Sequence, residues 1–249
     1  MKNILNKIKI HPLFLIFIII FILMGRFKFI LFFTVLILIH EIGHIVMSLL
    51  FKWNLDKIII LPFGGLIKYS EKINRPLIEE FLISINGVIV QYVFFLIFKN
   101  IIIYKYFSFL NYFIIIFNLL PIYPLDGSKI LNVFFNILTS FKKSILLTLI
   151  TSYVTIIILS IIFFDVNKLS MLIIYFLFKE TTNLYNEKDA IFNKFLLERC
   201  MYEFQFKFKK TIKKVDDMKK NYKHLFYTDR KYITEKYYLK KMFDIKYKI

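Results

Sequence analysis

Apolar residues in this chain form long runs, and polar residues fall mainly in the short segments between those runs. A helix needs about 20 apolar residues to cross the hydrocarbon layer of a membrane. We therefore predict an all-α polytopic membrane protein with about six transmembrane helices, of which the first and the last are short. The predicted spans are residues 10–25, 29–51, 77–98, 107–121, 144–164 and 169–179.

The first apolar run follows a lysine-rich start, as in a signal peptide. No small-residue cleavage site follows the run, because Met24-Gly25-Arg26 is a poor one and the only alanine of the chain is Ala190. We interpret the run as a retained membrane anchor.

The positive charges of the connecting segments give an independent test of this span count. In chain order, the segments before, between and after the runs carry 3, 2, 5, 2, 3, 1 and 19 Lys and Arg residues, where the last number includes Lys179 at the end of the sixth run. These numbers alternate as the positive-inside rule requires, with the higher numbers on the cytoplasmic side. The alternation predicts a multi-pass protein with both termini in the cytoplasm.

The composition supports the membrane assignment and excludes other classes. Of the 249 residues, 58% are hydrophobic, which is more than a soluble core of this size can bury. This excludes a disordered chain, a disulfide-stapled secreted domain and a conventional cytosolic enzyme, and the single cysteine, Cys200, cannot form an internal disulfide. Half of the net charge of +18 lies from Lys179 onward. We therefore expect a tail that faces anionic lipid, and no nucleic-acid partner.

Two histidines and a glutamate interrupt the second apolar run, which otherwise holds almost no polar residue. His40, Glu41 and His44 form an HExxH motif, and positions i and i+4 share one face of a helix, so both imidazoles can reach one ion. Ionisable groups are expensive inside a membrane span, which makes chance a poor explanation. With a carboxylate from elsewhere, the two imidazoles would complete an open zinc site. We predict one Zn²⁺ per chain, with Glu41 as the catalytic base.

The predicted third ligand is Asp126, which follows the fourth apolar run. Pro121 and Pro124 should end that helix, because proline breaks the backbone hydrogen-bond ladder. The freed backbone groups are tolerated at membrane depth only where they line a cavity inside the protein. An Asp-Gly pair alone is more often a simple turn, but here it accompanies an HExxH motif that lacks a third ligand. In the predicted orientation the two segments can meet on the cytoplasmic side.

Three other hypotheses use the same residues. An iron site is one, but membrane di-iron enzymes need many more histidines, and here only His11 and His224 remain; we expect His224 to be a surface residue. A metal transporter would need a second site or an acidic pathway along other spans, and the sequence shows neither. A catalytically inactive scaffold gives no reason for an intact Glu41. Helical HExxH spacing favours hydrolytic zinc.

Three segments together resemble the site-2 protease family of intramembrane zinc metalloproteases. They are the HExxH motif in the second run, Leu61-Pro62-Phe63-Gly64-Gly65, and the stretch from Asn118 to Gly127. The resemblance implies that His40, His44 and Asp126 bind zinc and that Glu41 is the catalytic base.

The resemblance also implies how the substrate binds. Asn118 and Pro124 would shape the rim of the active site, and Asn118 would help to stabilise the oxyanion. Residues 62–68 resemble the family's re-entrant loop, a short hairpin between spans two and three. Its Gly64 and Gly65 would present an edge to an extended substrate.

Within the family, the chain resembles the proteases that process a pro-sigma factor during sporulation. Residues 74–81 and Phe195-Leu196-Leu197-Glu198-Arg199 carry this finer likeness. It implies inhibitory membrane proteins as partners and a location in the mother-cell-derived membrane around the forespore. The alternative substrate is another membrane-tethered regulator. One departure is residues 84–88, where many members have Ala-Gly-Pro and this chain keeps only Gly87, which we interpret as a close helix-packing position.

The chain is predicted to have two parts. Residues 1–184 would form the transmembrane metalloprotease domain, and residues 185–249 a basic cytoplasmic tail, a remnant of a CBS-like regulatory domain. Within the tail, residues 184–220 are expected to be helical, and residues 225–249 to form helix or short strands.

Overall fold

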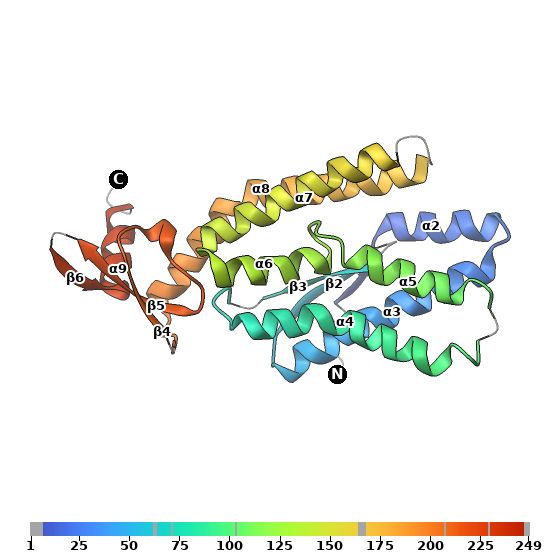
Figure 1. Cartoon of the computed structure of the whole chain (residues 1–249), viewed down its shortest axis with the longest axis horizontal. Coiled ribbons are helices and arrows are strands. Elements are labelled where there is room, and N and C mark those ends of the chain that lie inside the picture. The colour runs from blue at the N-terminus through green and yellow to red at the C-terminus, as the bar shows by residue number, and fades with distance from the viewer. Residues whose placement is uncertain are drawn as a thin grey trace. The chain divides into compact units, whose positions relative to one another are not determined.

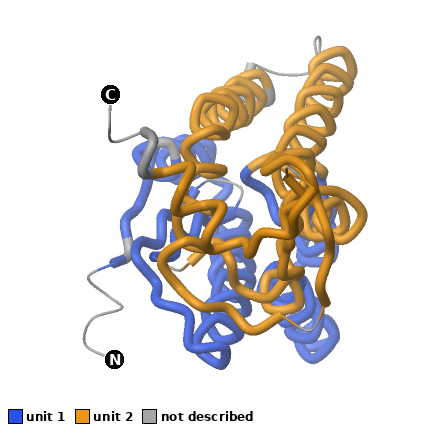
Figure 2. The backbone as a smooth tube through the Cα atoms, turned by 90° about the vertical axis from the view of Figure 1, so that its left-hand side faces the viewer, with its two compact units in different colours: residues 1–71, 81–120, 124–127 blue, residues 72–80, 121–123, 128–249 orange. Residues whose placement is uncertain are grey.

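The computed structural model describes residues 7–61, 64–70, 72–102, 104–163, 168–206, 208–228 and 230–246. Pro62 and Phe63 of the predicted re-entrant loop lie outside the described residues, as does the last residue of the predicted fifth span. The chain forms two compact units, which Figure 2 colours separately. Unit 1 comprises residues 1–71, 81–120 and 124–127, and unit 2 comprises residues 72–80, 121–123 and 128–249.

Unit 1 is built around helix α3 (Phe27–Leu50). Helices α2 (Pro12–Leu23) and α5 (Phe107–Asn118) pack against it, and α4 (Leu77–Phe98) joins the same unit from its second turn onward (Figure 1). Branched and aromatic side chains fill the space between these helices. The buried core consists of Ile30, Phe33, Leu36, Ile37, Phe95, Phe107, Leu110 and Ile114.

A small three-stranded sheet completes unit 1. Strand β1 (Ile8–Ile10) pairs in parallel with β2 (Leu55–Leu61), and β2 pairs antiparallel with β3 (Gly64–Tyr69). The run of isoleucines in β2 favours a strand because β-branched side chains pack well on a pleated surface. An antiparallel β2–β3 pair therefore lies where the re-entrant hairpin was predicted, with β3 at the edge of the described sheet. Its insertion into the membrane stays a prediction.

Unit 2 contains most of α6 (Asp126–Leu138), then α7 (Phe141–Ile162) and α8 (Lys168–Met201), which lie side by side (Figure 1). A second sheet follows, with its strands in the order β4 (Phe208–Ile212), β5 (Tyr222–Thr228) and β6 (Lys231–Thr234). The short helix η1 (Val215–Asp217) precedes β5, and helix α9 (Glu235–Lys246) follows β6. Its core joins α7 and α8 to this sheet through Phe141, Phe195, Leu196, Met218, Phe226 and Leu239.

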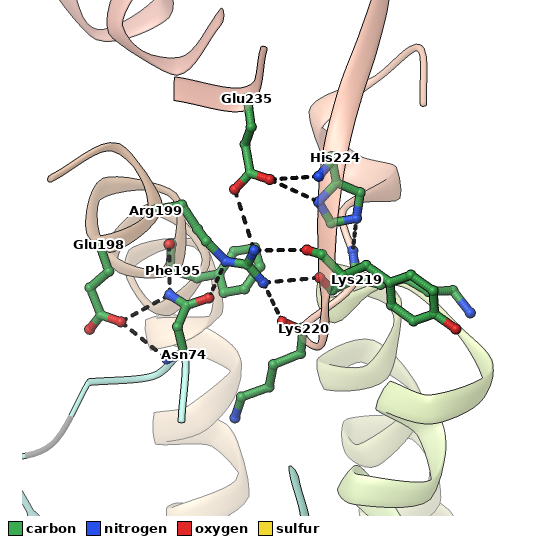
Figure 3. A network of polar contacts seen from close by, with 9 residues as sticks. Asn74, Phe195, Glu198, Arg199, Lys219, Lys220, His224 and Glu235 are labelled. Carbon is green, nitrogen blue, oxygen red and sulfur yellow. Dashed lines mark hydrogen bonds and ion pairs between the residues drawn. The ribbon is translucent and has the colours of Figure 1, made fainter. Parts of the chain in front are cut away.

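A buried polar network holds the end of α8 to the loop before α4 and to the tail (Figure 3). Glu198 accepts hydrogen bonds from the backbone and side chain of Asn74, and Arg199 donates to Asn74, to backbone carbonyls of the tail and to Glu235. Glu235 in turn pairs with the His224 ring at 3.2 Å. His224 is fully buried, so the expectation of a surface residue was wrong.

Helices occur at all six predicted spans, but their lengths differ. Among the described residues three are long and apolar enough to cross a membrane by length and composition, namely α3, α4 and α7. The apolar helical stretches Phe14–Leu23 and Phe107–Asn118 are shorter. The structure therefore gives three candidate spans, and the count of six crossings stays a prediction.

The tail differs from its prediction. The helix expected to reach residue 220 ends at Met201, and the sheet β4–β6 follows. The expectation of helix or short strands over residues 225–249 is confirmed, since most of β5, then β6 and α9 fall there. Helix α6 was also not expected, and with two sheets the fold is mostly helical rather than all-α. Residue 184 falls inside α8, and the division there into protease domain and tail stays a prediction.

Candidate metal centre

The two histidines of the HExxH motif lie on one buried face of α3. The side chains of His40 and His44 are 1% and 4% exposed, and their Nε2 atoms are 3.1 Å apart. The helical repeat brings residues four apart onto the same face, so the geometry follows directly from the sequence spacing. Two imidazoles thus point to one position in the interior of unit 1.

Neighbouring groups fix the tautomer of both rings. The side-chain amide of Gln91 donates from Nε2 to the backbone carbonyl and to Oδ1 of Asn111, both at 3.1 Å, so its Oε1 faces His40. His40 Nδ1–H therefore donates to Gln91 Oε1 at 3.0 Å. His44 Nδ1 lies 2.7 Å from the carbonyl oxygen of Ile83, which can only accept. In both neutral rings the proton is on Nδ1, and Nε2 keeps its lone pair.

Asp126 brings a third acceptor to the same place. Its Oδ2 lies 3.0 Å from His40 Nε2 and 2.9 Å from His44 Nε2, and all three residues are buried. Three lone-pair atoms in mutual contact repel one another unless a positive charge lies between them. A proton on one ring would supply a single hydrogen for three contacts, whereas one divalent cation would satisfy them all.

The dimensions of the cluster also fit zinc. Tetrahedral ligands at zinc bond lengths of about 2.0–2.1 Å are about 3.4 Å apart. The three observed separations of 3.0, 2.9 and 3.1 Å are a little shorter, a difference that small side-chain shifts would accommodate. Two imidazole nitrogens and one carboxylate oxygen are a donor set that zinc prefers when a fourth position is left for water. The residues present fit the ion that the sequence predicts.

Gly127, directly after Asp126, allows the chain to pack closely at this point. Helix α5 ends at Asn118, before the two prolines as predicted, and α6 begins at Asp126, so this aspartate is a helix residue rather than a turn residue. A Cβ atom on Gly127 would come within 3.0 Å of the backbone oxygens of Leu119 and Leu120. Glycine therefore lets the start of α6 approach the end of α5, which carries the carboxylate to the histidines.

Glu41 faces the hairpin. The backbone N–H of Gly65 donates to Glu41 Oε1 at 2.6 Å, and the side chain is 4% exposed. The other oxygen, Oε2, is buried and has no hydrogen-bond partner within the described part of the chain. A Cβ atom on Gly65 would lie within 3.0 Å of the carboxylate, so a larger residue here would displace the end of the Glu41 side chain. One oxygen orients the side chain, and the other is left for a ligand.

The remaining predicted site residues lie in the same unit. Asn118 is buried and donates to Ile114 at 3.0 Å, and a Cβ atom on Gly64 would lie 2.9 Å from its Oδ1. Pro124 is buried two residues before Asp126. The structure thus brings Gly64 and Asn118 together, but the roles of Asn118 and Pro124 at a substrate rim stay predictions.

The sequence analysis missed one feature of the site, the pair Gln91 and Asn111, and predicted another, Gly87, only in part. Gln91 and Asn111 are fully buried amides within apolar helices, and this placement was the available signal for a supporting role. Gly87 lies where α4 crosses α3, and a Cβ atom on it would come within 3.0 Å of His44 Nε2. The predicted close packing at Gly87 therefore leaves room for the His44 ring.

The site combines two histidines on one apolar helix, a carboxylate from a second segment and a buried glutamate beside a strand edge. This combination is typical of membrane-embedded metalloproteases. The profile of peptidase family M50 matches residues 28–107 and 99–163, together more than half of the chain. The chain belongs to peptidase family M50, the family of site-2 type metalloproteases.

Two relatives agree with this assignment. Stage IV sporulation protein FB of Bacillus subtilis (strain 168) is 35% identical over 155 residues, which cover 59% of this chain and 54% of that protein. The match therefore spans about half of the curated relative. The structure of the site-2 protease from Methanocaldococcus jannaschii has a TM-score of 0.59 at 22% identity, covering 71% of this chain and 89% of that one. This likeness shows the shared fold.

Proposed function

We propose that this chain is a zinc endopeptidase that cleaves a membrane-associated protein near the cytoplasmic face of the bilayer. His40, His44 and Asp126 hold the ion, and Glu41 is the catalytic base. The observation that carries this proposal is the cluster of three possible ligand atoms, from His40, His44 and Asp126, within 4.8 Å of one another. Beside it lies the buried Glu41, one of whose oxygens has no partner among the described residues.

The residues of the chain divide the chemistry between them. Zinc in this site supplies an activated water and polarises the scissile carbonyl. Glu41 Oε2 accepts the proton that the attacking water loses, and the same atom returns it to the leaving amine. The hydrogen bond from Gly65 to Oε1 keeps Oε2 turned towards the reacting atoms. Gln91 and Ile83 keep each imidazole in the tautomer that can act as a ligand.

The hairpin provides a way to present the substrate. A peptide bond inside a helix is protected by its own hydrogen bonds, so the substrate must be extended before cleavage. Strand β3 is an edge strand whose first residues, Gly64 and Gly65, lie beside Asn118 and Glu41. A substrate strand that pairs with this edge would place its backbone next to the catalytic base.

For the substrate, we propose a pro-sigma factor of sporulation. The name of the Bacillus subtilis relative, stage IV sporulation protein FB, supports a role in sporulation. The same proposal includes inhibitory membrane proteins as partners. It also places both termini in the cytoplasm and the protein in the mother-cell-derived membrane around the forespore. Another membrane-tethered regulator is the alternative substrate.

Co-expression with a candidate pro-protein tests this function. Glu41→Gln should reduce cleavage by about 100-fold or more, because it removes the general base. Zinc content and membrane insertion should be unchanged. Glu187→Gln, which alters an exposed carboxylate on α8, is the matched control and should cleave normally. Cleavage by the Glu41 variant at the wild-type rate would contradict the assignment.

A further inference from the structure

A second polar site lies in unit 2. A cavity of about 630 Å³ opens where α6 ends and α7 begins, and strands β4, β5 and β6 form its other walls. Among the residues that the structure describes, four lysines and one acidic residue, Asp217, line it. The lysines are Lys143, Lys210, Lys213 and Lys219. Four ammonium groups around one cavity create a positive potential that an anion would relieve.

Lys219 lies against the end of α6. Its Nζ donates to the carbonyl oxygens of Ile137 and Leu138, at 3.2 and 2.9 Å, at the end of α6. Burial and then the charge of Lys210 lower the pKa of the Lys219 ammonium below its usual range. Backbone carbonyls hold the Lys219 amine in place, and the positive charge of Lys210 disfavours its charged form. An anion in the cavity would stabilise that charged form.

The N-terminus of α7 opens into the same cavity. Ser140, the N-cap residue, lines the cavity and is 6% exposed, and its side chain caps no backbone N–H of the helix. Its Oγ is buried and has no hydrogen-bond partner among the residues that the structure describes. A helix N-terminus attracts anions through its backbone N–H groups and its dipole. A buried hydroxyl without a partner in this position is a donor that lacks an acceptor.

The remaining surroundings are amphipathic. Tyr227 and Tyr232, paired across β5 and β6 with ring centroids 5.1 Å apart, form one wall. Leu138 lines the cavity and is 72% exposed, and Ile137 beside it is 55% exposed. Helix α7, which begins here, is one of the candidate membrane spans. Exposed apolar residues, aromatic rings and lysines at the end of a membrane span are typical of a site at the lipid headgroup level.

We propose that this cavity binds the phosphate group of an anionic ligand, with Ser140 and the lysines as donors, and that a membrane phospholipid supplies this group. The same donors would accept inorganic phosphate, so the two sources must be separated by experiment. This inference concerns binding in unit 2 and does not depend on the proposed protease activity.

Equilibrium binding to the full chain in neutral detergent tests the proposal. The probe is a phosphatidylglycerol with a fluorescent label on its acyl chain, and its binding is measured by fluorescence anisotropy. The competitors are unlabelled phosphatidylglycerol, phosphatidylcholine and sodium phosphate. We expect saturable binding that phosphatidylglycerol reverses. Lys210→Gln should weaken it about fivefold, the value for one lysine beside an anionic lipid. Lys209→Gln is the matched control, since Lys209 is the exposed neighbour on β4 and does not line the cavity.

Ser140 gives a second, independent variant. Ser140→Ala should weaken binding without lowering the unfolding midpoint of the ligand-free chain, because the hydroxyl it removes has no partner to lose. Ser140→Thr, which keeps a hydroxyl, should bind more tightly than Ser140→Ala. Displacement by sodium phosphate would identify free phosphate as the source, and displacement by phosphatidylglycerol alone would identify the lipid. Equal losses in the Lys209 and Lys210 variants, or no saturable binding, would overturn the proposal.

Discussion

Replacing Gln91 with leucine removes the acceptor that fixes the His40 ring. In the native site His40 Nδ1–H donates to Gln91 Oε1 at 3.0 Å, and Gln91 is held in this orientation by its two hydrogen bonds to Asn111. Without that acceptor the ring is free to turn or to carry its proton on Nε2. In either case the nitrogen that faces Asp126 is no longer held as a ligand.

The size of the effect can be worked out from these contacts. Losing the partner of a metal-binding histidine costs about 10- to 100-fold in metal affinity, which is about 1.4 to 2.7 kcal/mol. The leucine also leaves two buried oxygens of Asn111 without their donor, at about 1 to 3 kcal/mol of folding stability. Gln91→Glu separates the two effects, because a carboxylate keeps an acceptor for His40 but gives Asn111 no donor.

The assay is competition with a zinc chelator on the purified full chain, with the unfolding midpoint measured in parallel. Gln91→Leu should lose zinc affinity and stability, whereas Gln91→Glu should lose stability and keep its zinc. Gln205→Leu, at an exposed position, is the control and should change neither. If Gln91→Leu binds zinc as tightly as the wild type, the argument that Gln91 fixes the His40 tautomer is wrong.

Two further predictions concern Glu41 and the tail. Gly65→Ala should displace the flexible Glu41 carboxylate and slow cleavage about 100-fold, with zinc content unchanged; a loss of zinc would contradict this explanation. In the tail, burial raises the pKa of the Glu235 carboxyl, but the hydrogen bonds from His224 and the charge of Arg199 outweigh it, so the pKa lies below its ordinary value of 4.5. This stabilisation is complete above pH 4.5 and is lost as the pH falls through the lowered pKa. The hydrogen-exchange protection factors of residues 208–246, which are corrected for the intrinsic exchange rate at each pH, should therefore fall on acidification below pH 4.5, and Glu235→Gln should remove that pH dependence.

The metal cluster was predictable because its determinants are local or chemically rare. The spacing of His40 and His44 places them on one helical face, whatever the rest of the fold does. Asp126 follows two prolines at the end of an apolar run, and few other carboxylates lie near a predicted span. The structure brings these three residues together, and their action as ligands stays a proposal.

Contacts between distant segments were not predictable in the same way. The hydrogen bond from Gly65 to Glu41 joins residues 24 positions apart, and that between Gln91 and His40 joins residues 51 apart. No periodicity encodes such pairs, because they depend on how the helices and the hairpin pack. The pairing of β1 with β2 is equally hidden, since β1 has three residues.

The tail was predicted only in part: residues 225–249 form short strands and a helix as expected, whereas the helix expected to reach residue 220 ends at Met201. The absence of glycine and proline after residue 127 favoured a longer helix. The interior of unit 2 then overrides that preference, because Phe226 and Leu239 are buried in a core with α7 and α8. Local propensity is a weak guide where tertiary burial decides.

Metal analysis of the purified, membrane-inserted chain tests the central claim most directly. We predict one zinc ion per chain in the wild type and in Glu41→Gln, and a loss of zinc in Asp126→Ala with the chain still inserted. A wild-type chain without zinc, or an Asp126→Ala chain that keeps its full zinc content, would contradict the account.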